Sequence, residues 1–305
     1  KLDLNGSVIK LLRSYLGPEN PTPADFNLKE ALANIDLEKA KNLIDKIKLT
    51  RNKNGRVFII GNGGSYDNAR LIALLLRQNG VNADVPGSGQ KYLEAGLSVG
   101  HDHIFEKTLQ EQGLNENDLL ITISGSGNSP NILKAIEFAH KTKTQVFALG
   151  GRDGGKMSSL AGSENSFIAR TPTMEIIEDV HAAFGYLVAT SLNTPYDEIS
   201  HKLNTQREKT KEIVNQLLET KNVQEMAKIL LAVESTLITK GRIILIGDSI
   251  GVNHVRADMA RGATNQLPFS FRIVENLGST NSMLATQNDD GADFTLVHAL
   301  ENVRP

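Results

Sequence analysis

The sequence predicts an α/β fold: a three-layer sandwich in which helices cover both faces of a parallel sheet. Apolar segments of strand length alternate with stretches of helical periodicity, the pattern of consecutive βα units. Two of the apolar segments run directly into glycine-rich loops that open helices, which is typical of the same fold class. The predicted strands begin at five positions: Val57, Ala83, Leu119, Gln145 and Phe167.

The first predicted domain follows a short leading part. Residues 1–27 form an N-terminal segment and linker, with an amphipathic piece near Val8–Tyr15 and a run of chain-breaking residues from Gly17 to Pro23. Residues 28–197 form the domain, and helical periodicity from Ala31 to Ile47 precedes its first strand.

An internal repeat defines a second domain over residues 198–305. Gly55-Arg-Val-Phe-Ile-Ile-Gly-Asn62 reappears as Gly241-Arg-Ile-Ile-Leu-Ile-Gly-Asp248, and each copy follows a helical lead-in. We expect a duplicated fold whose second copy is incomplete, because the sequence ends before any counterpart of the Leu119 strand. Either the chain is a fragment of a longer one or the second unit is truncated in nature.

The strand at Leu119 leads into a loop that alternates hydroxyl groups with glycines. Its members are Ser124, Gly125, Ser126, Gly127, Asn128 and Ser129. The glycines allow close backbone approach to a ligand, and the three serines supply hydroxyl donors. A helix over residues 132–140 follows, and its N-terminal partial positive charge faces the loop. We predict a bound phosphate; the alternative is a serine-glycine turn without function.

A second glycine loop follows the strand at Val57. It provides an amide, a glycine and a hydroxyl that suit a polyhydroxylated ligand beside the phosphate: Asn62, Gly63 and Ser65. The alternative is a dinucleotide-binding fingerprint, since Asp84 has the spacing of a ribose-binding acid. Tyr66, however, stands where the third glycine of that fingerprint belongs.

Composition narrows the class of partner. The 305 residues carry a formal net charge of −2 with both signs interspersed, so we expect neither a nucleic acid nor a membrane partner. The absence of cysteine excludes disulfides, thiolate zinc sites and cysteine nucleophiles. It also fits a cytoplasmic protein.

The helix after Thr173 carries the predicted acid/base pair, Glu178 and His181. The two residues are three apart and share a helix face beside an apolar stripe. We predict that they transfer protons; the alternative is an ordinary surface carboxylate–histidine pair. His101 and His103 also lie close together, but residues two apart face different ways on a helix, so we expect no metal site there.

Together these motifs resemble the sugar isomerase (SIS) domain family, most closely its phosphoheptose isomerases. The resemblance rests on the two loops and on Gly151-Arg-Asp-Gly-Gly-Lys156, and it covers residues 30–195 well and 205–305 weakly. It implies a flavodoxin-like, five-stranded parallel sheet and a phosphorylated sugar held by the three serines. It also implies a homo-oligomer with sites near subunit or repeat interfaces.

The departures from the family concern the catalytic machinery. On the helix after the first glycine loop, the family's histidine and catalytic glutamate are replaced by Leu71 and Leu75. On the later helix, Glu178 replaces a glutamine and Tyr186 follows where the family has a second histidine. We therefore expect no zinc site of the family's kind and no other cofactor.

Two function classes remain from the sequence. The first is an aldose–ketose sugar-phosphate isomerase that works through an enediolate, and the second is a non-catalytic phosphosugar sensor or regulatory subunit. In the second unit, Asp289 belongs to a polar loop that we expect to contribute to sugar binding. A nucleotide-dependent oxidoreductase ranks third, because neither glycine loop completes its fingerprint.

Overall fold

The computed structural model describes residues 4–16, 27–86 and 96–238. One compact unit spans Ile9–Gln224 and contains the sheet; a second contains Lys1–Val8 and Glu225–Pro305. The repeat at 241–248 and Asp289 lie outside the described residues, so the incomplete second copy remains a prediction. None of the described helices combines the length and apolar character of a membrane span.

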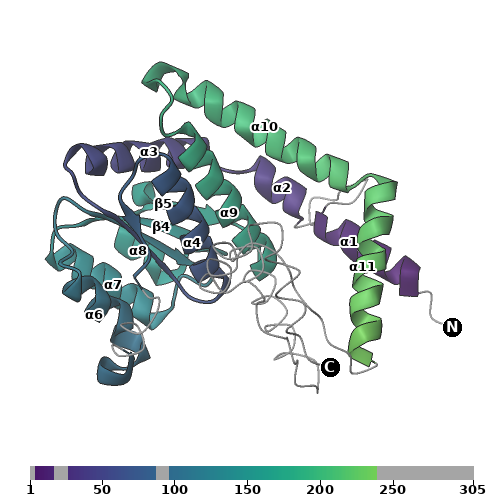
Figure 1. The fold of residues 1–305 in the computed structure, drawn as a ribbon, viewed down its shortest axis with the longest axis horizontal. Helices are drawn as coiled ribbons and strands as arrows, with labels where there is room; N and C mark the ends of the chain where they lie inside the picture. Colours follow the sequence, from purple (N-terminus) through teal and green to yellow (C-terminus); the bar gives the residue numbers. More distant parts are fainter. Residues whose placement is uncertain (1–3, 17–26, 87–95, 239–305) are drawn as a thin grey trace, which may run out of the picture. The chain divides into compact units, whose positions relative to one another are not determined.

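A five-stranded parallel sheet forms the middle layer, as predicted (Figure 1). Its strands are β1 (Val57–Gly61), β2 (Ala83–Asp84), β3 (Leu119–Ser124), β4 (Gln145–Gly151) and β5 (Ser166–Ala169). They lie in the order β2-β1-β3-β4-β5, and every neighbouring pair is parallel. This is the flavodoxin-like order. All residues of β1 and β3 are buried, which explains their continuous apolar runs.

Helices cover both faces of the sheet (Figure 1). One face carries α3 (Leu37–Asn52), α4 (Gly64–Gln78) and α9 (Met174–Ser191), and the other carries α6 (Ile104–Glu111), α7 (Pro130–Lys141) and α8 (Gly155–Ala161). On the second face, Phe58 and Leu120 pack with residues of α6, α7 and α8. Since strand side chains alternate, Asn62 and Ser124 point to this same α7 side.

The other described α-helices precede or follow the sandwich in the chain. They are α1 (Leu4–Leu16), α2 (Leu28–Ala33), α10 (Ile199–Leu217) and α11 (Thr220–Ile238), with short 3-10 helices η1 (His101–His103), η2 (Ser163–Asn165) and η3 (Tyr196–Glu198). Within the main unit, α10 packs against α2, α3 and α9.

The helical periodicity of residues 31–47 belongs to two helices rather than one. Asp36 interrupts it, because its carboxylate accepts hydrogen bonds from Glu38 N (3.0 Å) and Lys39 N (3.1 Å) and so caps α3. Ile35, in the break, is still buried, so the apolar pattern continues across a point where the helix does not.

Candidate functional site

The two glycine loops leave the same edge of the sheet from adjacent strands. β1 and β3 pair in parallel, with Gly61 opposite Ile123, so both loops begin side by side. β2 and β3 lie on opposite sides of β1, so successive connections diverge at this point. Open α/β sheets bind ligands in the crevice that such a switch point leaves at the carboxyl ends of the strands.

Three serine hydroxyls converge in the serine loop, residues 124–129. Ser124 Oγ lies 3.2 Å from Ser129 Oγ and 3.5 Å from Ser126 Oγ. Ser129 immediately precedes α7, and its hydroxyl makes no capping bond to that helix. Hydroxyl hydrogens rotate, so all three groups can turn toward one acceptor such as a phosphate oxygen. The N-terminus of α7 adds a partial positive charge at the same place.

Close backbone packing holds the serine loop in this shape. Gly127 has a φ of +64°, and a Cβ there would lie 2.1 Å from Gly154 O. Met157 N also donates a hydrogen bond of 2.9 Å to Gly127 O. The loop therefore rests backbone to backbone on the turn that joins β4 to α8, and a side chain at this contact would separate the two.

A reciprocal amide pair joins the two loops. Asn62 Nδ2 donates to Asn131 Oδ1 and Asn131 Nδ2 donates to Asn62 Oδ1, both at 2.9 Å. Asn131 Oδ1 also accepts a hydrogen bond from Ile132 N (3.0 Å), which fixes the orientation of the amide. Sequence reasoning placed Asn62 at the site but missed Asn131, because nothing in the chain pairs residues 69 positions apart.

The other two residues predicted from the first glycine loop have different environments. Gly63 is exposed at the sheet edge with a φ of +55°, and this conformation makes the turn into α4. Ser65 is buried, and its N–H donates to Asn62 O at 3.0 Å within the same turn. Their contact with a sugar remains a prediction, as does that of Asp289.

Glu178 lies directly behind the first glycine loop. A Cβ on Gly64 would lie 2.3 Å from Glu178 Oε2, so α4 begins against this carboxyl group. Asn68 Nδ2 holds the backbone of Glu178 through a 2.9 Å hydrogen bond to its carbonyl oxygen. Only 3% of Glu178 is exposed.

His181 lies one turn further along α9 and faces the sheet. Its Nε2–H donates to Gly150 O at 2.9 Å, and the ring is fully buried beside Phe167. Burial lowers the pKa of His181 to about 4, so the ring is neutral at pH 7. Gly150 opposes Ser124 in the sheet, so His181 supports the strand beside the serine loop. The structure does not bring His181 to the loop itself.

Since Glu178 and His181 are both buried, the alternative of a surface pair is wrong. They also have separate partners, because the carboxylate meets the start of α4 whereas the imidazole meets β4 and β5. Helical spacing predicted that they share a helix face. It could not predict that two residues three apart would face different neighbours.

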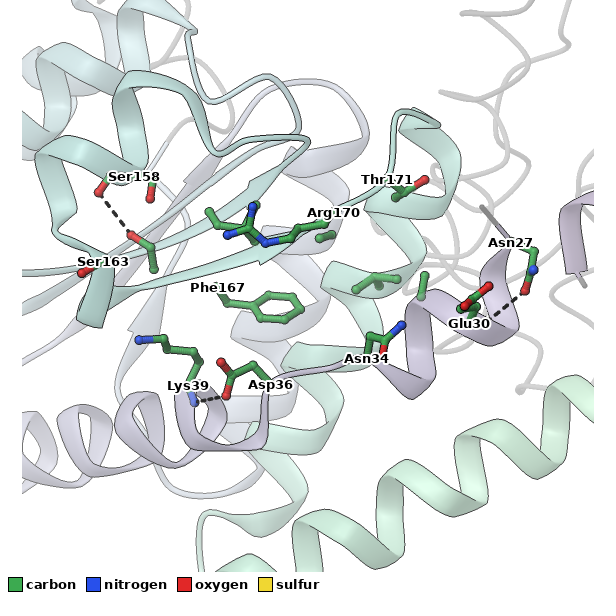
Figure 2. A pocket seen from close by; sticks show the side chains of 15 residues that line it. Asn27, Glu30, Asn34, Asp36, Lys39, Ser158, Ser163, Phe167, Arg170 and Thr171 are labelled. Carbon is green, nitrogen blue, oxygen red and sulfur yellow. Dashed lines mark hydrogen bonds between the residues drawn. The ribbon is translucent and has the colours of Figure 1, made fainter. Parts of the chain in front are cut away.

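A cavity of about 550 Å³ lies elsewhere, along the edge strand β5 and the ends of α2 and α3 (Figure 2). Asp36 and Lys39 line one side of it and Phe167 and Arg170 another, as Figure 2 shows. None of the predicted site residues lines this cavity. The candidate site is therefore defined by the polar groups that converge at the β1–β3 edge of the sheet, and not by this cavity.

The matches to known proteins fall on the unit that contains both loops. A family model described as the SIS domain matches residues 27–151. A phosphoheptose isomerase of Buchnera aphidicola is 37% identical over 164 residues, which are 52% of this chain and 76% of that protein. One of Aeromonas salmonicida is 39% identical over 142 residues, which are 45% and 71% of the two chains. The chain belongs to the SIS domain family.

A solved structure agrees with the SIS assignment. The phosphoheptose isomerase of Neisseria gonorrhoeae superimposes with a TM-score of 0.52 and 26% identity, covering 55% of this chain and 92% of that one. The fold predicted from the sequence for residues 28–197 is therefore confirmed in its class and topology.

The zinc site implied by the resemblance to SIS heptose isomerases does not fit the residues present. Leu71 and Leu75, both half-buried on α4, offer no ligand atoms where the family has a histidine and a glutamate. Within the part of the chain that the structure describes, no three His, Asp or Glu side chains gather as metal ligands.

We predict that Gly127→Ala destabilises the SIS unit more than Gly113→Ala. Both glycines have a positive φ, but a Cβ at Gly113 meets nothing within 4 Å whereas one at Gly127 meets Gly154 O. Backbone strain alone costs about 1 kcal/mol, and the clash should add roughly 2 kcal/mol. Urea denaturation measures both variants, and equal losses would contradict the packing described for the loop.

A second prediction concerns the pH dependence of stability. The pKa of His181 is about 4 in the folded state, below its usual 6.5, so the unfolded chain binds a proton that the folded chain does not. The contribution of His181 to the free energy of unfolding is therefore complete above pH 6.5. It is lost as the pH falls toward 4, and the loss is about 2 kcal/mol at pH 5.

Urea denaturation between pH 7 and pH 5 checks this prediction against His181→Gln, which cannot titrate. The variant should start less stable and lose less over the same interval. An identical pH slope for the two proteins would assign the acid sensitivity to other groups.

Proposed function

We propose that this SIS protein is a sugar-phosphate isomerase of the phosphoheptose isomerase type, which interconverts sedoheptulose 7-phosphate and an aldoheptose 7-phosphate. The observation that carries the proposal is the cluster of Ser124, Ser126 and Ser129 at the switch point of the sheet. The names of its relatives support the substrate class.

The serine loop suits a phosphate monoester. The three hydroxyls and the N-terminus of α7 lie at one place, and each favours a bound anion. The loop contains no lysine or arginine. Binding would therefore depend on oriented dipoles and neutral donors, which recognise the shape of a phosphate as well as its charge.

The amide pair of Asn62 and Asn131 borders the phosphate position and presents polar groups to the rest of the sugar. An aldose–ketose conversion needs a base for the carbon proton and donors for the oxyanion of the enediolate. We propose Glu178 as the carbon base, because it lies at the same edge of the sheet behind Gly64. We propose that His181 assists by holding α9 against β4.

We propose that no zinc takes part, since the leucines at positions 71 and 75 remove two of the family's ligands. We also propose assembly into a homo-oligomer with sites near the interfaces. Leu74 and Tyr186, on α4 and α9, are 36% and 44% exposed and leave an apolar surface for a neighbour. The absence of cysteine fits a cytoplasmic protein.

A non-catalytic phosphosugar-binding role is the second candidate. It is favoured by the same Leu71 and Leu75, which replace groups that the family uses in catalysis, and by the burial of Glu178. In that role the serine loop alone would be retained. The two candidates differ in whether the bound ketose exchanges a carbon-bound proton with water.

We predict that Ser126→Ala weakens binding of sedoheptulose 7-phosphate by about 10- to 100-fold, because a hydrogen bond to a charged group is lost. Ser163→Ala serves as the control, since Ser163 is exposed on η2, outside the serine loop. Calorimetry measures both affinities. Unchanged affinity in Ser126→Ala would remove the serine loop from the phosphate site.

We further predict that Glu178→Gln abolishes turnover and leaves binding intact. Wild-type protein in deuterated water should place deuterium on carbon beside the carbonyl of sedoheptulose 7-phosphate and form aldose, both visible by proton NMR. The variant should do neither, whereas Glu175→Gln, an exposed change on the same helix, should behave as wild type. Binding without exchange in the wild type would favour the non-catalytic role.

A further inference from the structure

His101 lies beside the amide pair of the candidate site. It begins η1, which packs against α7, and its Nε2 lies 3.4 Å from Asn131 Nδ2. Asn131 pairs with Asn62 and is two residues beyond Ser129, so the ring contacts the amide pair at the helix start that follows the serine loop. The His101 side chain is 67% exposed, in contrast to the fully buried His181.

The surrounding hydrogen bonds determine which nitrogen of His101 carries a lone pair. Asn131 Oδ1 accepts a hydrogen bond from Ile132 N. If the Asn131 amide were flipped, its NH₂ group would face the Ile132 N–H, and two donors would oppose each other. Asn131 Nδ2 therefore gives one N–H to Asn62 Oδ1 and presents the other to His101 Nε2. Nε2 accepts, and in the neutral ring the proton resides on Nδ1, which lies 3.9 Å from Asp102 Oδ1.

This arrangement prepares His101 to take up a proton at Nε2. The nitrogen that faces the site holds a lone pair, and the contact with Asn131 is long enough to yield to a substrate hydroxyl. Histidine is the side chain most often used for general acid–base proton transfer.

We propose that His101 carries the proton between the two reacting oxygens of the sugar. The inference rests on the proposed isomerase function. It gives that function a catalytic residue that the resemblance to the family did not identify. A base first removes a proton from C1, whose electron pair forms the C1–C2 double bond while the C2 carbonyl becomes an alkoxide. His101 Nε2 accepts the O1 proton and delivers it to O2. Return of the first proton to C2 then leaves an aldehyde at C1, with the base and His101 restored.

The dimensions agree with this assignment. In an extended heptulose 7-phosphate, seven bonds separate C2 from phosphorus, a span of about 8 Å. Ser129 and Asn131 are two residues apart, a separation of roughly 5.5 Å in a helix. The Asn131 side chain and its contact with His101 Nε2 lengthen this path from the serine loop to the imidazole. A phosphate on the three serines therefore leaves C1 and C2 within reach of the imidazole.

The test compares two rates in deuterated water for wild type, His101→Gln and His103→Gln. Proton NMR follows deuterium entering C1 of sedoheptulose 7-phosphate and, separately, the appearance of aldose. Glutamine can still accept the hydrogen bond of Asn131, so the amide pair stays in place. His103 is the matched control, since it is exposed on η1 and its Nδ1 contacts Glu106 at 2.8 Å.

His101→Gln should lose aldose formation by about 10²-fold while retaining affinity and C1 exchange, because the carbon base still works and only the oxygen transfer is missing. His103→Gln should match wild type. Added imidazole should restore aldose formation to His101→Ala. Wild-type aldose formation in His101→Gln, or an equal loss of exchange and conversion, would overturn the role of His101. Absence of both reactions in the wild type would instead overturn the isomerase function together with this inference.

Discussion

The parallel pairing of β1 with β3 is the constraint on which the site depends. Because parallel strands end at the same edge, the two glycine loops emerge together although about sixty residues separate them in the chain. The reciprocal bond between Asn62 and Asn131 then fixes one loop relative to the other. Two neutral amides satisfy each other here without buried charge, so the junction is both specific and inexpensive to desolvate.

Glycines set how closely the surrounding segments approach these loops. At Gly64 the missing side chain admits the Glu178 carboxylate, and at Gly127 it admits the backbone of the β4–α8 turn. In both places a second segment occupies the volume of a Cβ. The glycine motifs therefore encode contacts across the fold as well as turns, and the positions of the serine hydroxyls and of Glu178 depend on those contacts.

The sequence predicted the sheet well because each strand is a local pattern with a local boundary. It located β1 and β3 and the loops that follow them, since apolar runs, glycines and helix starts are read within a few residues. It predicted one periodic stretch where Asp36 caps a new helix, because the side chain that breaks the helix sits within an intact apolar pattern. Residues 239–305, which hold the predicted repeat, lie outside the described part of the chain.

The periodicity of the sequence does not predict the environment of a side chain, and two histidines show why. His181 is three residues from Glu178 on one helix, the spacing expected of an acid/base pair. Its partners, however, are a strand carbonyl and an aromatic ring, and burial keeps it neutral. His101 has no such spacing, but η1 brings it to an amide whose own partner lies on another loop. Proton transfer requires a lone pair that a ligand can reach. That property depends on tertiary contacts. Of these two histidines, His101 meets the requirement, although its sequence pattern is the weaker one.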